Sequence, residues 1–347
     1  MNINIPLLKK LTETPGAPGF ETQISDLIIQ EITPYVDTVS TDNMGNIYAL
    51  KKGASDNKKV MLAAHMDEIG FIVTHIDDNG FIKFAPLGGF DPKTLTAQRV
   101  VVHGKKDIIG VMGSKPIHVM TPEERDKKVK ITDYFIDLGR SKEEVEELVE
   151  IGTPITRERE LIEIGDCVNG KSLDNRISVY VLIETLQSLL NKEIPYDTYA
   201  VFTTQEEVGL RGAQVATIKV QPDIAFAIDT TIAFDLPGST PSDQVTKLGK
   251  GPAIKIMDAS VVSHPRLVSF MKETAHKANI PWQPEILQAG GTDTAMLQKM
   301  VAGGAIAGAV SIPTRNLHQV IESSHKKDVE YSVKLLATIL ETIHLFE

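Results

Sequence analysis

The sequence predicts an α/β protein: a mixed-sheet domain with helices on both faces, interrupted by a small all-β insert. Two observations predict this fold class. Short apolar runs, typical of buried strands, alternate with helical patterns before residue 70 and again after residue 163. From Phe71 onward, short β-rich runs are instead separated by turns. We therefore expect an α/β domain of residues 1–70 and 164–347 and a β-rich domain of residues 71–163.

Composition and charge limit the possible functions. The 347-residue chain is 42% hydrophobic and 24% charged, which is typical of a globular protein. Its net charge of −10 argues against nucleic acid or an anionic membrane as a main partner, because both bind basic surfaces. Cys167 is the only cysteine, which excludes an internal disulfide. The first residues lack the apolar region of a signal peptide, and no apolar run is long enough to span a bilayer, so we expect a cytoplasmic enzyme or binding protein.

Helical spacing and turn residues predict the elements that precede the insert. Pro15–Gly19 breaks the chain between two helices, and Pro34 ends the second. The strands are apolar runs separated by turns. The predicted elements are helices at 5–14 and 20–33 and strands at 36–41, 46–51 and 58–65.

The insert is predicted from four short β-rich runs. Asn79-Gly80 lies between two of them and is a strong hairpin signal. Residues 114–130 are charged and predicted as a loop, whereas 141–150 predicts an acidic, solvated helix.

Alternation of helices and strands returns after Gly165. In the last helix, apolar side chains lie on one side and Asp328 is the predicted N-cap. The predicted elements are helices at 175–190 and 265–279 and strands at 197–204, 223–229, 253–258 and 303–312.

The stretch MLAAHMDEIG at 61–70 suggests the start of a metal site. Its apolar run ends in His65 and Asp67, which are two residues apart and would lean to the same face of a continuing strand. Taken alone, this stretch is better explained as a helix or strand end that happens to be polar. A metal site requires further ligands from distant segments.

Four other segments supply candidate ligands. Asp174 lies just before a predicted helix, which it could also cap. Glu206 and Glu207 follow a predicted strand, where adjacent carboxylates point in different directions, although a solvated acidic turn is the alternative. Asp229 ends another strand, and His318 lies just beyond the strand at 303–312.

Together these residues predict a two-metal site, because strand ends of an open α/β sheet converge on one crevice. The five ligands His65, Asp174, Glu207, Asp229 and His318 exceed the three that a catalytic zinc usually takes from protein. Five nitrogen and oxygen ligands suit two metals about 3.5–4 Å apart, with a shared carboxylate and a bridging water that becomes a hydroxide near neutral pH. Glu206 would then act as general base, and Asp67 would orient His65.

The chain resembles the M42 family of dinuclear metallo-aminopeptidases, the tetrahedral or glutamyl aminopeptidases. The resemblance covers essentially the whole chain and rests on six stretches in the same order: AAHMDEIGF, SLDNR, QEEVGLRGA, AID, GGTD and PTR…H. It implies that His65 and Asp229 hold one metal, that Glu207 and His318 hold the other, and that Asp174 bridges them. It also implies that Glu206 is the catalytic base and that Asp67 lies beside the first ligand.

The same resemblance implies substrates and assembly. Family members remove amino acids from free N-termini of peptides, use zinc or cobalt, and form dimers that build tetrahedral dodecamers through a PDZ-like insert. Manganese is also compatible with nitrogen and oxygen ligands. Asn316 and Gln319 depart from the family pattern around the final histidine, which leaves the substrate preference open. Gly290, Gly291, Thr292 and Asp293 match a family turn near the substrate, but could equally form a glycine turn that caps the next helix.

Three other functions are alternatives to a two-metal aminopeptidase. A binding scaffold with a dead site should lack a ligand or the base, and none is missing. A glycosidase normally uses two carboxylic acids without a metal pair, so the histidines argue against it. A metal-dependent deacylase or carboxypeptidase of the same wider fold is the main alternative. The sequence does not indicate whether an acidic, neutral or basic N-terminal residue is preferred.

Overall fold

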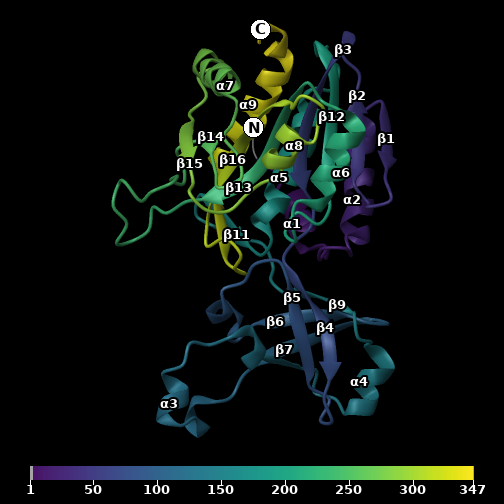
Figure 1. Cartoon of the computed structure of the whole chain (residues 1–347), viewed down its shortest axis with the longest axis vertical. Helices are drawn as coiled ribbons and strands as arrows, with labels where there is room; N and C mark the ends of the chain where they lie inside the picture. Colours follow the sequence, from purple (N-terminus) through teal and green to yellow (C-terminus); the bar gives the residue numbers. More distant parts are fainter. Residues whose placement is uncertain (1–2, 347) are drawn as a thin grey trace.

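The computed structural model describes residues 3–346, which form an eleven-stranded mixed sheet with flanking helices and a separate six-stranded barrel (Figure 1). The barrel is inserted between strands β3 (Ser55–His65) and β10 (Ile162–Ile164) of the sheet. All paired strands of the barrel are antiparallel. This arrangement confirms the predicted fold class.

Four parallel strands form the centre of the sheet. They lie in the order β12 (Tyr196–Thr203), β3, β13 (Ile224–Ile232) and β16 (Ile306–Arg315). Thr203 pairs with His65, so β12 and β3 end together. The carboxyl ends of all four strands therefore meet along one edge, which is where ligands bind in open α/β sheets.

The remaining strands extend this sheet on both sides. On one side β2 pairs antiparallel with β12, and on the other β17 pairs antiparallel with β16. The remaining strands are β1 (Thr38–Thr41), β2 (Ile47–Lys51), β11 (Cys167–Gly170), β14 (Ala253–Met257), β15 (Gln283–Ile286) and β17 (Glu322–His325).

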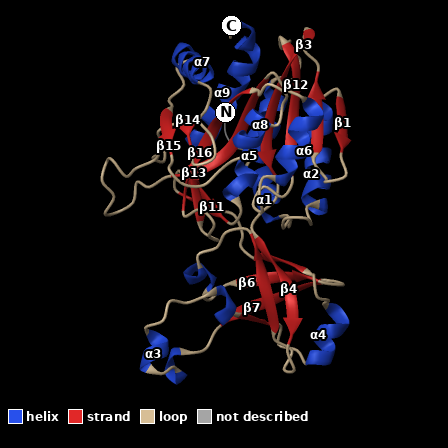
Figure 2. Ribbon diagram, in the orientation of Figure 1, coloured by secondary structure: helices blue, strands red, loops and turns tan. Residues whose placement is uncertain are grey.

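Helices cover both faces of the sheet, as Figure 2 shows. Alternate residues of the central strands face opposite ways, so Leu62 belongs to one core and Ala63 to the other. One core contains branched side chains from α1 (Ile5–Glu13), α2 (Thr22–Ile32), α5 (Leu173–Ser188), α7 (Pro265–Lys277) and α9 (Lys326–Thr342). The other core is rich in alanine and contains residues of α6 (Arg211–Val220) and α8 (Thr294–Lys299).

The barrel has its own hydrophobic core, which includes Phe71, Val100 and Ile136. Its strand order is β4-β5-β8-β7-β6-β9. The strands are β4 (Gly70–Ile76), β5 (Ile82–Leu87), β6 (Arg99–His103), β7 (Asp107–Gly113), β8 (Phe135–Asp137) and β9 (Pro154–Arg157).

Three local expectations differ from the structure. Residues 114–130 were expected as a loop but contain the short helix α3 (Pro122–Arg125), whose capping box is formed by Thr121 and Glu124. The strand expected to end at residue 312 continues to Arg315 in β16. Asp328 is not the N-cap of α9: His325 holds that position, and the Asp328 carboxylate accepts hydrogen bonds from the backbone N–H groups of Gly249 and Gly251.

The acidic helix expected at 141–150 is α4 (Lys142–Leu148), which is capped by Ser141. Among residues 3–346, no helix is both long and apolar enough to cross a membrane.

Candidate metal centre

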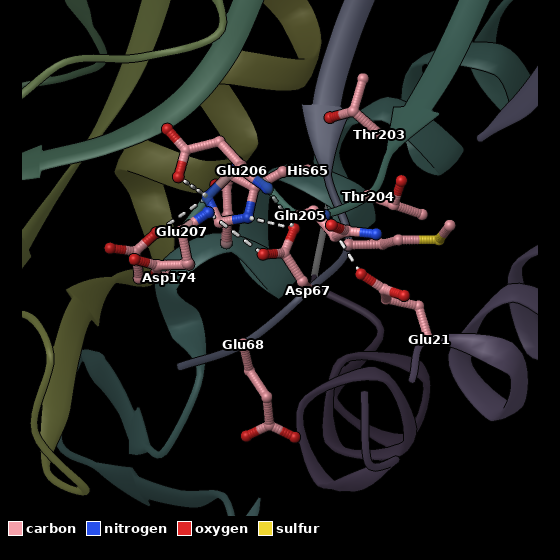
Figure 3. Close-up of polar contacts among 12 residues, drawn as sticks. Glu21, His65, Asp67, Glu68, Asp174, Thr203, Thr204, Gln205, Glu206 and Glu207 are labelled. Carbon is pink, nitrogen blue, oxygen red and sulfur yellow. Dashed lines mark hydrogen bonds and ion pairs between the residues drawn. The ribbon is translucent and has the colours of Figure 1, made fainter. Parts of the chain in front are cut away.

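The predicted metal-site residues come from five segments and meet at the carboxyl edge of the parallel strands. Figure 3 labels five of these residues: His65, Asp67, Asp174, Glu206 and Glu207. His65 is the last residue of β3, Asp229 lies within β13, and Asp174 lies in the first turn of α5. Glu206 and Glu207 occupy the loop between β12 and α6, and His318 follows β16. His65, Asp174 and Asp229 are buried, the side chains of Glu206 and Glu207 are 10% and 6% exposed, and that of His318 is 37% exposed.

Two groups of ligand atoms share Asp174. His65 Nε2 lies 3.3 Å from Asp174 Oδ1 and 3.7 Å from Asp229 Oδ1. His318 Nε2 lies 3.3 Å from the other oxygen, Asp174 Oδ2, and 3.6 Å from Glu207 Oε2. Within each group the candidate ligand atoms lie within 4.8 Å of one another. One carboxylate thus faces both histidines with different oxygens, as a bridging ligand would.

Asp67 connects the first histidine to the loop of the two glutamates. Its Oδ1 lies 3.4 Å from His65 Nδ1, on the side of the ring away from Asp174. The same carboxylate accepts hydrogen bonds from the backbone N–H groups of Glu206, at 3.0 Å, and Glu207, at 3.1 Å. Asp67 therefore positions three residues of the site at once.

Glu21 supports the same loop from the N-terminal part of the chain (Figure 3). Its Oε1 accepts hydrogen bonds from the backbone N–H groups of Gly19, at 2.9 Å, and Gln205, at 3.1 Å. Gln205 has φ of 53°, a left-handed conformation that non-glycine residues rarely adopt. No sequence pattern predicts this role of Glu21, because its partner is a backbone group 184 residues away.

Two further contacts of the site were also missed. His318 Nδ1 lies 2.9 Å from the carbonyl oxygen of Gly89, which follows β5 of the barrel. Donation of the Nδ1 proton to this carbonyl leaves Nε2 free to act as a ligand. The buried Glu322 of β17 accepts a hydrogen bond of 2.9 Å from the backbone N–H of Asp174.

The electrostatics of the cluster fit bound cations. Burial, together with the charge of Asp174, raises the pKa of Glu207 to about 7. Burial and neighbouring carboxylates also raise the pKa of Asp229 and of Glu206 well above their ordinary values. A buried carboxylate is stabilised by a nearby positive charge, and the two histidines do not offset all the negative charge here. The nitrogen and oxygen donors therefore suit divalent cations such as zinc, cobalt or manganese.

Glu206 lies in a different position from Asp229 and Glu207, the carboxylates that accompany Asp174 in the two ligand groups. Its Oε2 lies 3.9 Å from His65 Nε2, and its side chain is 10% exposed. It also lines a cavity of about 590 Å³ that opens over both histidines. A carboxylate with a raised pKa at the wall of such a cavity can take up and release a proton.

Part of the predicted turn at 290–293 lines the cavity, and part of it is buried in the protein interior. Gly291 and Thr292 line the cavity, whereas Asp293 does not. Asp293 precedes α8, but its side chain makes no capping hydrogen bond and instead accepts one of 2.6 Å from Thr203 Oγ1. Burial raises the pKa of Asp293 to about 6.

Comparison with known proteins identifies the family. Residues 45–335 match the family described as M42 glutamyl aminopeptidase. The chain is 37% identical to the lysyl aminopeptidase of Pyrococcus furiosus over 348 residues, covering 97% of this chain and 96% of the relative. Among solved structures, the TET aminopeptidase of Thaumarchaeota archaeon SCGC AB-539-E09 is 36% identical with a TM-score of 0.95, covering 99% and 98% of the two chains.

A third relative is a peptidase that assembles. The Pyrococcus horikoshii TET1 peptidase, which can assemble into a tetrahedron or a large octahedral shell, is 34% identical with a TM-score of 0.87. That comparison covers 97% of this chain and 98% of the relative. Because the matches extend over nearly the whole length and include the metal-site segments, the chain belongs to the M42 glutamyl aminopeptidase family of metallo-aminopeptidases.

Proposed function

We propose that this chain is a two-metal aminopeptidase that hydrolyses the N-terminal peptide bond of short peptides. The observation that carries the proposal is the position of Asp174, whose two oxygens face different histidines. His65 and Asp229 would hold one cation, and Glu207 and His318 the other. Two divalent cations bound there, Zn²⁺ or Co²⁺ with Mn²⁺ as a further candidate, would polarise the scissile carbonyl and lower the pKa of water.

The side chains of the chain itself perform the proton transfers. Glu206 accepts a proton from the attacking water at a carboxylate oxygen while the new C–O bond forms. It then gives that proton to the leaving amine as the C–N bond breaks. Asp67 keeps His65 and the backbone of Glu206 in place, so that the base stays beside the reacting atoms.

The family assignment favours an aminopeptidase over a deacylase or a carboxypeptidase. A chelator should abolish peptidase activity, and Zn²⁺ or Co²⁺ should restore it. The decisive experiment compares free and N-acetylated forms of the same short peptides, with mass spectrometry of the products. Release of the N-terminal residue from the free peptide alone supports the proposal. Equal cleavage of the acetylated peptide, or release from the C-terminus, would contradict it.

Three further proposals concern organisation. We place the boundaries of the catalytic domain at residues 1–70 and 164–347, with residues 71–163 as a dimerisation insert. We also propose a cytoplasmic enzyme that forms dimers and a tetrahedral dodecamer, since the solved structure of PhTET1-12s contains a dodecamer and is 33% identical to this chain. Light scattering of the purified protein tests the assembly.

A further inference from the structure

We propose that the substrate pocket accepts a neutral, apolar N-terminal side chain, such as leucine or methionine, in preference to an acidic or basic one. This inference rests on the proposed aminopeptidase function and names its substrate class. Apart from the residues already placed at the metal centre, the cavity is lined by glycine, alanine, threonine, four aliphatic side chains and one charged pair. The aliphatic residues are Leu210, Ile232, Leu287 and Leu317.

The charged pair consists of Lys255 at β14 and Asp258 just after it. The Lys255 side chain is 1% exposed, and its Nζ lies 2.8 Å from Asp258 Oδ2 and 3.0 Å from Glu285 Oε1. The carboxylates of Asp258 and Glu285 raise the pKa of Lys255 against the lowering effect of burial, so it stays charged. With two carboxylates in contact, this ammonium group is not free to bind a third from an acidic substrate.

Both carboxylate oxygens of Asp258 also already have hydrogen-bond partners. Its Oδ1 accepts hydrogen bonds from Ser260 N at 2.8 Å, Ser260 Oγ at 2.7 Å and Val261 N at 3.0 Å. Its Oδ2 accepts from Lys255 Nζ at 2.8 Å and Thr292 Oγ1 at 3.2 Å. A basic substrate side chain therefore meets a carboxylate whose two oxygens already have five donors.

Outside the metal centre, the charged groups of the pocket wall are therefore already paired with each other, and none is free to bind a charged substrate side chain. A charged side chain that enters loses hydration without gaining a partner, whereas an apolar side chain gains from burial. Glu285, which is fully buried behind Lys255, gives the cluster one more carboxylate than cations. Acidic substrates should therefore be the poorest of all.

The test is a substrate panel on the metal-reconstituted enzyme. We expect kcat/KM for leucyl and methionyl p-nitroanilides to exceed that for the lysyl compound by at least about tenfold, and that for the glutamyl compound by more. Calorimetry with free leucine, lysine and glutamate should give the same order of binding. Preference for glutamate or lysine in either measurement overturns the inference. If no anilide is cleaved, the proposed function fails, and the calorimetry still decides the side-chain preference.

Two variants should shift the preference in opposite directions. Asp258→Asn frees part of the charge of Lys255 and should raise the glutamyl-to-leucyl ratio of kcat/KM several-fold. Lys255→Met leaves the carboxylates without their cation and should raise the lysyl-to-leucyl ratio. Lys277→Met is the matched control: it removes the same charge, but from a lysine of α7 that is 75% exposed. If both variants fold and their ratios of kcat/KM are unchanged, the inference is overturned. If both fail to fold, the substrate panel on the parent enzyme is the deciding measurement.

Discussion

Two buried polar clusters lie next to each other in the large domain but balance their charges differently. In the first, which we call the Glu68 cluster, Lys171 Nζ lies 2.7 Å and 2.6 Å from the two oxygens of Glu68. Ser172 Oγ donates a further hydrogen bond to Glu68, and Arg176 lies 3.9 Å away. The second is the candidate metal centre, and Asp67, which positions His65, directly precedes Glu68 in the chain.

Glu68 and Glu207 are both shielded from solvent, but their pKa values shift in opposite directions. Burial favours a raised pKa for Glu68, but Lys171 and Arg176 outweigh it and hold the pKa below its usual value. At Glu207, burial and the charge of Asp174 raise the pKa to about 7. The difference shows where the protein supplies its own positive charge and where a bound cation would supply it.

The largest expected effect in this comparison comes from Asp174→Asn. Loss of the shared carboxylate should weaken both cation sites, so that metal content falls well below two per chain. The kcat/KM should fall by at least about 10³-fold. Mass spectrometry of metals after dialysis checks this, with Asp166→Asn at an exposed position as control. A variant with two metals and parental activity would remove Asp174 from the bridging position.

Glu206→Gln separates the proposed base from the proposed ligands. It should keep both metals and the parental melting temperature, while kcat falls by about 10²–10⁴-fold, because the proton transfer is lost. Glu207→Gln should instead lose metal as well as activity. Steady-state kinetics and metal analysis of both variants are the measurements, and equal metal loss in the two would contradict the assignment.

Lys171→Met tests whether this lysine balances the buried charge of Glu68. It leaves Glu68 buried without its closest cation, which should lower the free energy of unfolding by about 3–5 kcal/mol. Urea denaturation of the metal-free protein measures this. The control is Lys142→Met, whose partner Asp78 is 94% exposed, and which should change stability little because an exposed ion pair is screened by solvent. A loss in Lys171→Met no larger than in the control would show that the Glu68 cluster is not balanced by this lysine.

Glu21→Gln has the smallest expected effect and depends on pH. Burial, with the charge of Asp67, raises the pKa of Glu21 from 4.5 to about 7. The folded protein therefore binds more protons than the unfolded chain between these values, and the contribution of Glu21 to stability is present below pH 4.5 and lost as the pH rises through 7. Glutamine keeps the acceptor oxygen without this titration.

Relative to the parent, Glu21→Gln should thus gain stability as the pH rises from 4.5 to 8, by about 3 kcal/mol. Thermal unfolding of the metal-free protein across this range is the measurement. The control is Asp26→Asn on the same helix α2, because the Asp26 side chain has no hydrogen-bond or ion-pair partner among the described residues. A parallel pH dependence of parent and Glu21→Gln would show that folding does not shift the pKa of Glu21.

Several features of the site were predictable because they are local. An apolar run that ends in a polar side chain marks a strand end, and parallel strands bring their ends to one edge. This pattern selected His65, Glu206, Glu207 and Asp229 as candidates, and all four line the same cavity. The run at 253–257 ends in the same way before Asp258, so the same signal could have identified that residue.

The misassigned cap at Asp328 and the unpredicted contacts of the site share a physical origin, whereas the capping box of α3 is local in sequence. Asp328 has the residue type of an N-cap, but its carboxylate bonds to Gly249 and Gly251, which are distant in sequence. Gly89 contributes only a backbone carbonyl to His318, and no side-chain pattern predicts such a contact. Glu322 likewise binds a backbone group of Asp174 rather than a side chain.

The sequence by itself determined the alternation of strands and helices, the interruption by a β-rich insert and the nitrogen and oxygen chemistry of the candidate ligands. These follow from the period of apolar residues and from side-chain type, both of which are local properties. Only the tertiary structure decided that the two oxygens of Asp174 face different histidines and that Lys255 is already paired with Asp258 and Glu285. Such pairings depend on how distant segments pack and on the direction of each side chain, which residue spacing does not specify.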